Sequence, residues 1–69
     1  MAWLYVISTN DTETVYNAVR LANVSLTKGK EVNMFMVGRG VEFNEISTGN
    51  FDINGQIEEF YSKGGELIV

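Results

Sequence analysis

The chain has 69 residues, of which 45% are hydrophobic, and its formal net charge is −4. This length allows a single domain over residues 1–69, and a chain of this size buries only about 60% of the surface that its unfolded state exposes. Small domains commonly gain extra stability from disulfides, a metal or a partner subunit. Because the sequence contains no Cys and no His, disulfides and the usual zinc ligands are excluded. Two sources of extra stability remain. One is oligomerisation, and the other is further chain, in which case residues 1–69 are a partial domain.

Composition also bears on partners and location. The five basic residues are scattered along the chain, so we expect no stripe of positive charge for nucleic acid. No apolar run approaches the roughly 20 residues that a membrane-spanning helix needs. The N-terminus lacks the basic start and small-residue cleavage site of a signal peptide. We therefore expect a cytoplasmic protein with neither nucleic acid nor a membrane as its partner.

The first half of the chain predicts a strand followed by a helix and a second strand. Residues 3–9, WLYVIST, form a nearly unbroken apolar run, typical of a strand buried on both faces. Asn10 or Asp11 starts a helix that Gly29 ends. Residues 31–37, EVNMFMV, predict the second strand, with its later part buried on both faces. One continuous helical stripe should cover the sheet, and it consists of Val15, Ala18, Val19, Ala22 and Leu26.

The second half predicts a turn, a loop, a second helix and a third strand. Residues 38–40, GRG, follow the second strand as a turn, and residues 42–51 form the least regular stretch. A helix then runs from about Asp52 or Ile53 to Lys63, with Ile53, Ile57 and Phe60 on its buried face. Gly64 and Gly65 stop this helix, and residues 66–69 begin the third strand.

This order of elements indicates an α/β fold with a parallel sheet. Two right-handed β-α-β crossovers follow from the alternation of strands and helices. We expect the strand order 2-1-3, which would place the two helices on opposite faces in a three-layer α/β/α arrangement. Sheets of this kind bind ligands beyond the carboxyl ends of their strands. The possible ligand-facing residues at those ends are Ser8, Thr9, Asn10, Gly38, Arg39 and Gly40.

The chain offers little catalytic equipment. Ser8 and Thr9 have no activating base nearby in the sequence, and no Cys or His is present as a nucleophile or base. Whether the protein is an enzyme is therefore open, and we expect no catalytic residue, no metal site and no cofactor. The start of the first helix favours anions in general. In this chain Asp11 and Glu13 occupy the same positive end, which favours capping over ligand binding.

Two apolar residues of the first helix lie off its buried stripe. At 100° per residue, Leu21 and Val24 point away from the sheet, on the side of Asn17 and Arg20. Scattered apolar residues are common on protein surfaces, and a partner surface is the alternative interpretation. Leu21 and Val24 are thus the candidate oligomer contacts.

The sequence resembles the amino-terminal part of the DsrE/DsrF-like family of sulfur-relay proteins. The segments that carry the resemblance are STND after the first strand, NAVRLA in the helix, KGKEV, GRGVE and EEFYSKGGE. The resemblance implies a flavodoxin-like topology, a homo-oligomer that is trimeric or hexameric, and sulfur-relay proteins as partners. In many members the carrier is a Cys just after the strand that corresponds to residues 66–69. The present sequence ends at that strand, as if truncated after strand three, and contains no Cys.

Two functions from different classes follow. The first is a sulfur-relay (persulfide carrier) subunit whose longer form would present a Cys after Val69. The second is a non-catalytic module for oligomerisation or small-ligand binding. A Cys within a few codons after Val69, followed by two apolar runs, would favour the first, and a stop codon would favour the second.

Overall fold

The computed structural model describes residues 2–69. Its elements alternate between strands and helices along the chain, as the sequence pattern predicts. They are β1 (Ala2–Ile7), α1 (Thr12–Thr27), β2 (Glu31–Met36), the 3₁₀ helix η1 (Gly38–Glu45), α2 (Ile53–Ser62) and β3 (Glu66–Ile68). All strand pairs are parallel. The predicted α/β class with a parallel sheet is therefore confirmed.

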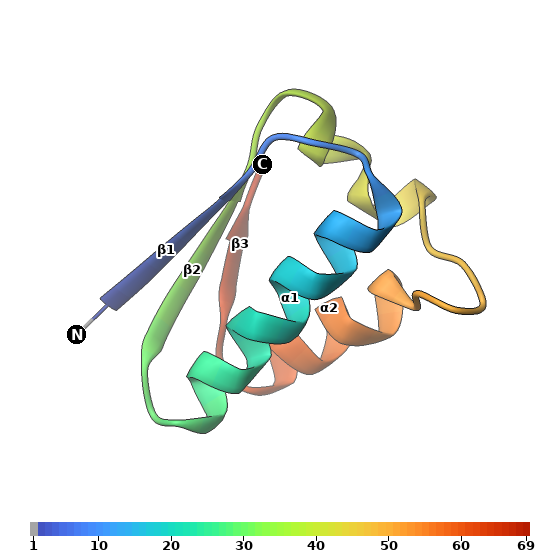
Figure 1. Cartoon of the computed structure of the whole chain (residues 1–69). Helices are drawn as coiled ribbons and strands as arrows, with labels where there is room; N and C mark the ends of the chain where they lie inside the picture. The colour runs from blue at the N-terminus through green and yellow to red at the C-terminus, as the bar shows by residue number, and fades with distance from the viewer. Residues whose placement is uncertain (1) are drawn as a thin grey trace.

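The predicted strand order is wrong. The sheet has the order β1-β2-β3, so β2 and not β1 is the central strand. Since both right-handed crossovers advance in the same direction across the sheet, they place their helices on the same face. Figure 1 shows α1 and α2 together on one side of the three strands. Within residues 2–69 the fold thus has two layers, and the expected three-layer arrangement is not formed.

A direct contact between the two helices accompanies this order. The Asn23 side-chain amide, buried in α1, donates to the backbone oxygen of Gln56 in α2 at 3.0 Å and to its side-chain oxygen at 2.9 Å. Two helices on opposite faces of a sheet could not share these hydrogen bonds. Apolar periodicity alone does not reveal such a contact, because Asn23 is polar and lies beside the predicted stripe.

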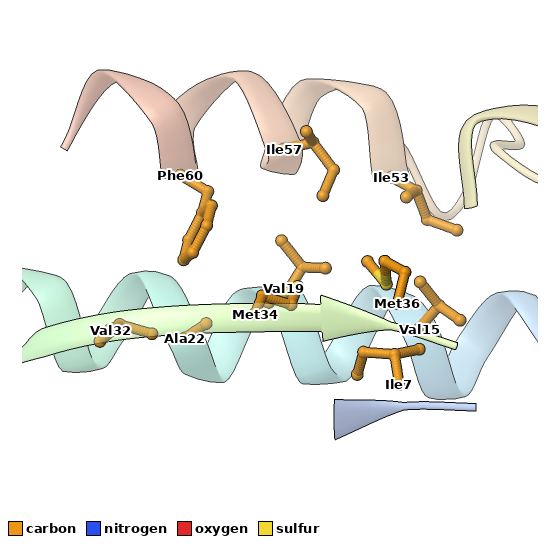
Figure 2. Packing of buried hydrophobic residues seen from close by; sticks show 10 residues of the cluster. All are labelled: Ile7, Val15, Val19, Ala22, Val32, Met34, Met36, Ile53, Ile57 and Phe60. Carbon is orange, nitrogen blue, oxygen red and sulfur yellow. The ribbon is translucent and has the colours of Figure 1, made fainter. Parts of the chain in front are cut away.

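The core fills the space between the helices and the sheet. The buried side chains come from β1, α1, β2 and α2, and Figure 2 shows them meeting between the layers. They are Ile7, Val15, Val19, Ala22, Val32, Met34, Met36, Ile53, Ile57 and Phe60. The predicted buried residues of α2 are all confirmed. In α1, Val15, Val19 and Ala22 are buried, while Ala18 and Leu26 are partly buried against the cluster.

The other face of the sheet is open, which corrects the prediction that β1 and the later part of β2 are buried on both faces. Strand residues alternate between the faces, and Ile7 and Met34 lie on the face that the helices cover, while Trp3 at the start of β1 shares that face but is 46% exposed. The large apolar residues on the opposite face are between 39% and 63% exposed, and they are Leu4, Val6, Phe35 and Ile68. We call this surface the open sheet face.

Residues 38–45 form a 3₁₀ helix, where the sequence predicts a turn followed by the start of a loop. Gly38 adopts a positive φ of 53°, which starts this segment, and the Gly40 N–H donates to the Val37 carbonyl at 2.8 Å. The pattern missed η1 because a short 3₁₀ helix has three residues per turn and a poorly defined apolar stripe. The remaining residues, 46–52, lead from η1 to α2.

Candidate functional site

The carboxyl ends of β1 and β2 come together, as the parallel sheet predicts. The Val37 N–H donates to the Ile7 carbonyl at 2.9 Å, which extends the pairing beyond the strands. Gly40 lies directly on the end of β1, because a Cβ added there would be 2.1 Å from the Ile7 oxygen. Gly38 lies close to Ser8, with 3.8 Å between the position of an added Cβ and the Ser8 oxygen. These two glycines thus allow η1 to pack on the end of β1.

The polar side chains at this edge form one small cluster. Arg39 forms an ion pair with Glu42 at 3.4 Å, and the Asn10 side-chain amide donates to Glu42 Oε1 at 3.2 Å. The cluster brings together two of the predicted residues, Asn10 and Arg39, through Glu42, which the site prediction did not include. Thirty-two positions separate Asn10 from Glu42, so no local sequence signal could have paired them. Because the Arg39 side chain is largely exposed, the ion pair contributes little to stability.

The start of α1 is closed by the chain's own carboxylate. Asp11 is the N-cap residue, and it accepts hydrogen bonds from the Thr14 backbone N–H at 3.0 Å and from the Thr14 hydroxyl at 2.6 Å. The Thr14 hydroxyl and then its backbone N–H hold the pKa of Asp11 below its ordinary value of 3.8. The Asp11 N–H in turn donates to the Thr9 hydroxyl at 3.1 Å. Capping therefore occupies the position at which an anion would bind.

The chemistry that this edge can perform is limited by its side chains. The exposed Ser8 hydroxyl and the partly buried Thr9 hydroxyl lie beside no His or Cys, since the sequence has neither. Within residues 2–69, no group of three or more Asp and Glu side chains gathers in a way that could hold a metal ion. The predicted strand-end residues thus form a closely packed polar edge without an activated nucleophile.

The outer face of α1 is the second predicted site. Leu21 is 57% exposed and Val24 is 47% exposed, so both point away from the sheet as predicted. Together with Asn17 and Arg20 they line a shallow hollow of about 330 Å³. A neighbouring groove of about 270 Å³ between α1 and α2 shares Arg20 and Val24 with this hollow. We call the surface formed by Asn17, Arg20, Leu21, Val24 and Lys28 the outer α1 face.

Basic residues gather beside this groove. Arg20, Lys28 and Lys63 line it, which places three of the five basic residues of the chain on one side. The Lys63 ammonium donates to Glu59 and to the Thr27 hydroxyl, each at 2.8 Å. Within residues 2–69, Arg20 and Lys28 form no ion pair. Arg20 lies on α1 and Lys28 caps its C-terminus, and the packing of α1 on α2 brings Lys63 beside them.

The open sheet face is the site that the sequence prediction missed. Its apolar residues lie in two neighbouring rows across the strands, and the register pairs Leu4 with Asn33 and Val6 with Phe35. Phe35 is paired in turn with Ile68, and Asn33 with Glu66. The available signal is the apolar run of β1, which by itself predicts a second layer of helices within the chain.

No family model, curated protein or solved structure matches this chain. Within residues 2–69, no helix is both long enough and apolar enough to cross a membrane.

Proposed function

We propose that this chain is a cytoplasmic DsrE/F-like assembly module that associates with further copies of itself and does not itself carry sulfur. The single observation that supports this proposal best is the open sheet face. Leu4, Val6 and Phe35 expose large side chains on one continuous surface, where an isolated monomer leaves apolar area in water. Contiguous exposed apolar surface of this kind marks interaction sites.

A copy of the chain is the proposed occupant because the fold leaves a second apolar surface available. Leu21 and Val24 expose their side chains on α1, which lies in the helix layer on the other side of the core. The chain also has no disulfide to add stability to its small core. Association would bury apolar surface on both sides of the molecule and would stabilise the fold by mass action.

Sedimentation velocity over a wide range of protein concentrations tests this function. We expect the average mass to rise with concentration and far-UV circular dichroism to remain that of a folded α/β protein. Association should also raise the melting temperature as the protein concentration rises. A chain that remains a folded monomer throughout this range would contradict self-association.

The second candidate function is sulfur relay, and the resemblance to sulfur-relay proteins favours it. Persulfide transfer requires a thiolate, since only deprotonated sulfur attacks the donor and carries the extra atom. Met34 and Met36 cannot act in this way, because a thioether has no ionisable S–H and both side chains are buried in β2. Sulfur carriage would therefore belong to a longer form with a Cys after Val69, acting with sulfur-relay partner proteins.

Intact-protein mass spectrometry after incubation with a cysteine desulfurase and cysteine separates the two functions. We expect no gain of a sulfur atom by the 69-residue chain. A stable gain of one sulfur atom would contradict the proposal that this chain does not carry sulfur. A gain confined to a longer natural form with a Cys after Val69 would assign sulfur carriage to the added residues and leave the role of residues 1–69 in assembly unchanged.

A further inference from the structure

We propose that the outer α1 face of one copy packs on the open sheet face of the next copy, in a head-to-tail contact. This inference rests on the proposed self-association and specifies the two surfaces that meet. Helix α1 of one copy would then cover the sheet face of the next copy that α1 and α2 of that next copy leave exposed. The contact would complete, between copies, the layer that the strand order β1-β2-β3 leaves out of one copy.

The apolar residues of the two surfaces are arranged so that they can meet. Phe35 lies at the centre of the row formed by Val6, Phe35 and Ile68, because β2 is the central strand. Leu21 and Val24 form a narrow apolar strip along α1, flanked by the polar residues Asn17 and Arg20. A helix covering a sheet uses this kind of stripe, and the strip would lie across the row.

The charges of the two surfaces are opposite. Glu31 and Glu66 are exposed at the starts of β2 and β3, and their register positions place them on the open sheet face. Arg20 and Lys28 are exposed on the outer α1 face. Within residues 2–69, none of these four side chains forms an ion pair. Each surface thus carries charges that the other could neutralise.

The distance between the apolar and the charged residues is also similar on the outer α1 face and on the open sheet face. Four residues separate Val24 from Lys28, which is about 6 Å along a helix. The Glu66 row and the Phe35 row are two residues apart on β2, which is about 6.6 Å along a strand. A helix that runs antiparallel to the strands, as crossover helices do, would place Val24 over the Phe35 row and Lys28 over Glu66.

A symmetric sheet-to-sheet dimer fits these residues less well. With a two-fold axis parallel to the strands, β1 of one copy would face β3 of the other and the Glu66 carboxylate would lie opposite Leu4. Burying an unpaired carboxylate against an apolar side chain is costly. With the axis across the strands and along the Phe35 row, the two rows would meet, but the Glu31 and Glu66 carboxylates would face no basic residue, since β1, β2 and β3 contain none. Only the head-to-tail contact brings the apolar residues together and pairs the carboxylates.

A head-to-tail contact has a definite consequence for assembly. Each copy contacts one neighbour through its outer α1 face and another neighbour through its open sheet face. Copies can therefore add until a ring closes, or they can form a filament. The open sheet face measures roughly 15 Å by 20 Å from strand spacing and rise. Since this area is well below the roughly 800 Å² per partner of a standard specific interface, we expect weak association that depends strongly on concentration.

Two blocked variants test this arrangement. Val6→Glu places a carboxylate on the open sheet face, and Leu21→Glu places one on the outer α1 face. We expect each variant alone to associate about tenfold or more weakly than the parent chain. An equimolar mixture should regain a 1:1 dimer, because one variant keeps an intact helix surface and the other an intact sheet surface. The two blocked surfaces carry the same charge and should not pair with each other.

The outcomes distinguish this inference from the proposed function. If the parent chain remains monomeric at all concentrations, self-association itself fails. If the parent associates but Leu21→Glu associates equally well, or the mixture gives no dimer, association stands and the head-to-tail arrangement is overturned. Circular dichroism of each variant verifies that it is folded before its association is measured.

Charge reversal at exposed residues provides an independent test. Lys28→Glu should weaken association, because the new carboxylate would approach Glu66 of the next copy. The double variant Lys28→Glu with Glu66→Lys should recover it, since every contact again joins opposite charges. An equal weakening by the double variant and Lys28→Glu alone would overturn the pairing of these residues. Lys30→Glu, a reversal just beyond α1, is the matched control and should change association less.

Discussion

The two faces of the sheet are built from similar side chains and have different environments. Met34 and Phe35 are neighbours on β2, but Met34 is fully buried under the helices and Phe35 is 39% exposed. On β1, Ile7 is buried while Val6 lies on the open sheet face. Apolar character therefore does not decide which face of a strand is covered. The direction of the crossovers decides it, because it sets the face on which the helices lie.

The largest expected effect comes from placing a charge in the covered layer. Val19→Asp or Ile57→Asp would bury an unpaired carboxylate between the helices and the sheet. We expect a loss of several kcal/mol, on the order of the whole stability of a small domain. Thermal unfolding measured by circular dichroism checks this, with Leu21→Asp on the outer α1 face as the control at low protein concentration. If Val19→Asp melts like the parent chain, the register of α1 is wrong.

A pair of neighbouring substitutions sharpens the comparison between the faces. Met34→Ala removes a fully buried side chain and should reduce the free energy of unfolding by about 2–5 kcal/mol. Phe35→Ala should cost about 1 kcal/mol or less in the monomer, because its side chain is partly in water. Urea denaturation at low protein concentration measures both. Equal losses would show that Phe35 is covered even in the monomer.

The third expected effect is steric and tests how closely η1 packs on the end of β1. Gly40→Ala would place a methyl group 2.1 Å from the Ile7 carbonyl oxygen, so the backbone must shift. We expect a destabilisation of about 1–3 kcal/mol, typical of overpacking. Gly49→Ala is the matched control, because an added Cβ there meets nothing within 4 Å. An equal loss of unfolding free energy in the Gly40→Ala and Gly49→Ala variants, measured by urea denaturation, would contradict the close approach of Gly40 to β1.

The smallest expected effect concerns pH and the cap of α1. Asp11 has a pKa below 3.8 in the folded chain, so its contribution to stability is present above 3.8 and is lost as pH falls through the folded value. Asp11→Asn keeps a side-chain acceptor but removes the titration. The variant should therefore lose less stability than the parent chain on acidification below pH 3.8. Parallel acid-unfolding curves for the two proteins would show that Asp11 does not contribute through its charge.

Local pattern determined the strands, the two α-helices and the buried face of each α-helix, but not the 3₁₀ helix η1. The stripe containing Val15 and Val19, the cap at Asp11 and the turn at Gly29 follow from spacing and side-chain chemistry within a few residues, and the structure contains all of them. The meeting of the β1 and β2 ends also followed, because parallel strands share their carboxyl edge. The sequence-based prediction of a parallel α/β sheet needed no more than this.

Only the tertiary structure decided the strand order, and with it the surfaces available for function. The order 2-1-3 and the order β1-β2-β3 satisfy the same apolar periodicity, since each places every helix stripe against a sheet. They differ in contacts between segments far apart in the chain, such as Asn23 with Gln56 and Asn10 with Glu42. No local signal encodes those pairs. Because the order sets the faces on which the helices lie, it left the apolar residues of β1 and β2 exposed on one side.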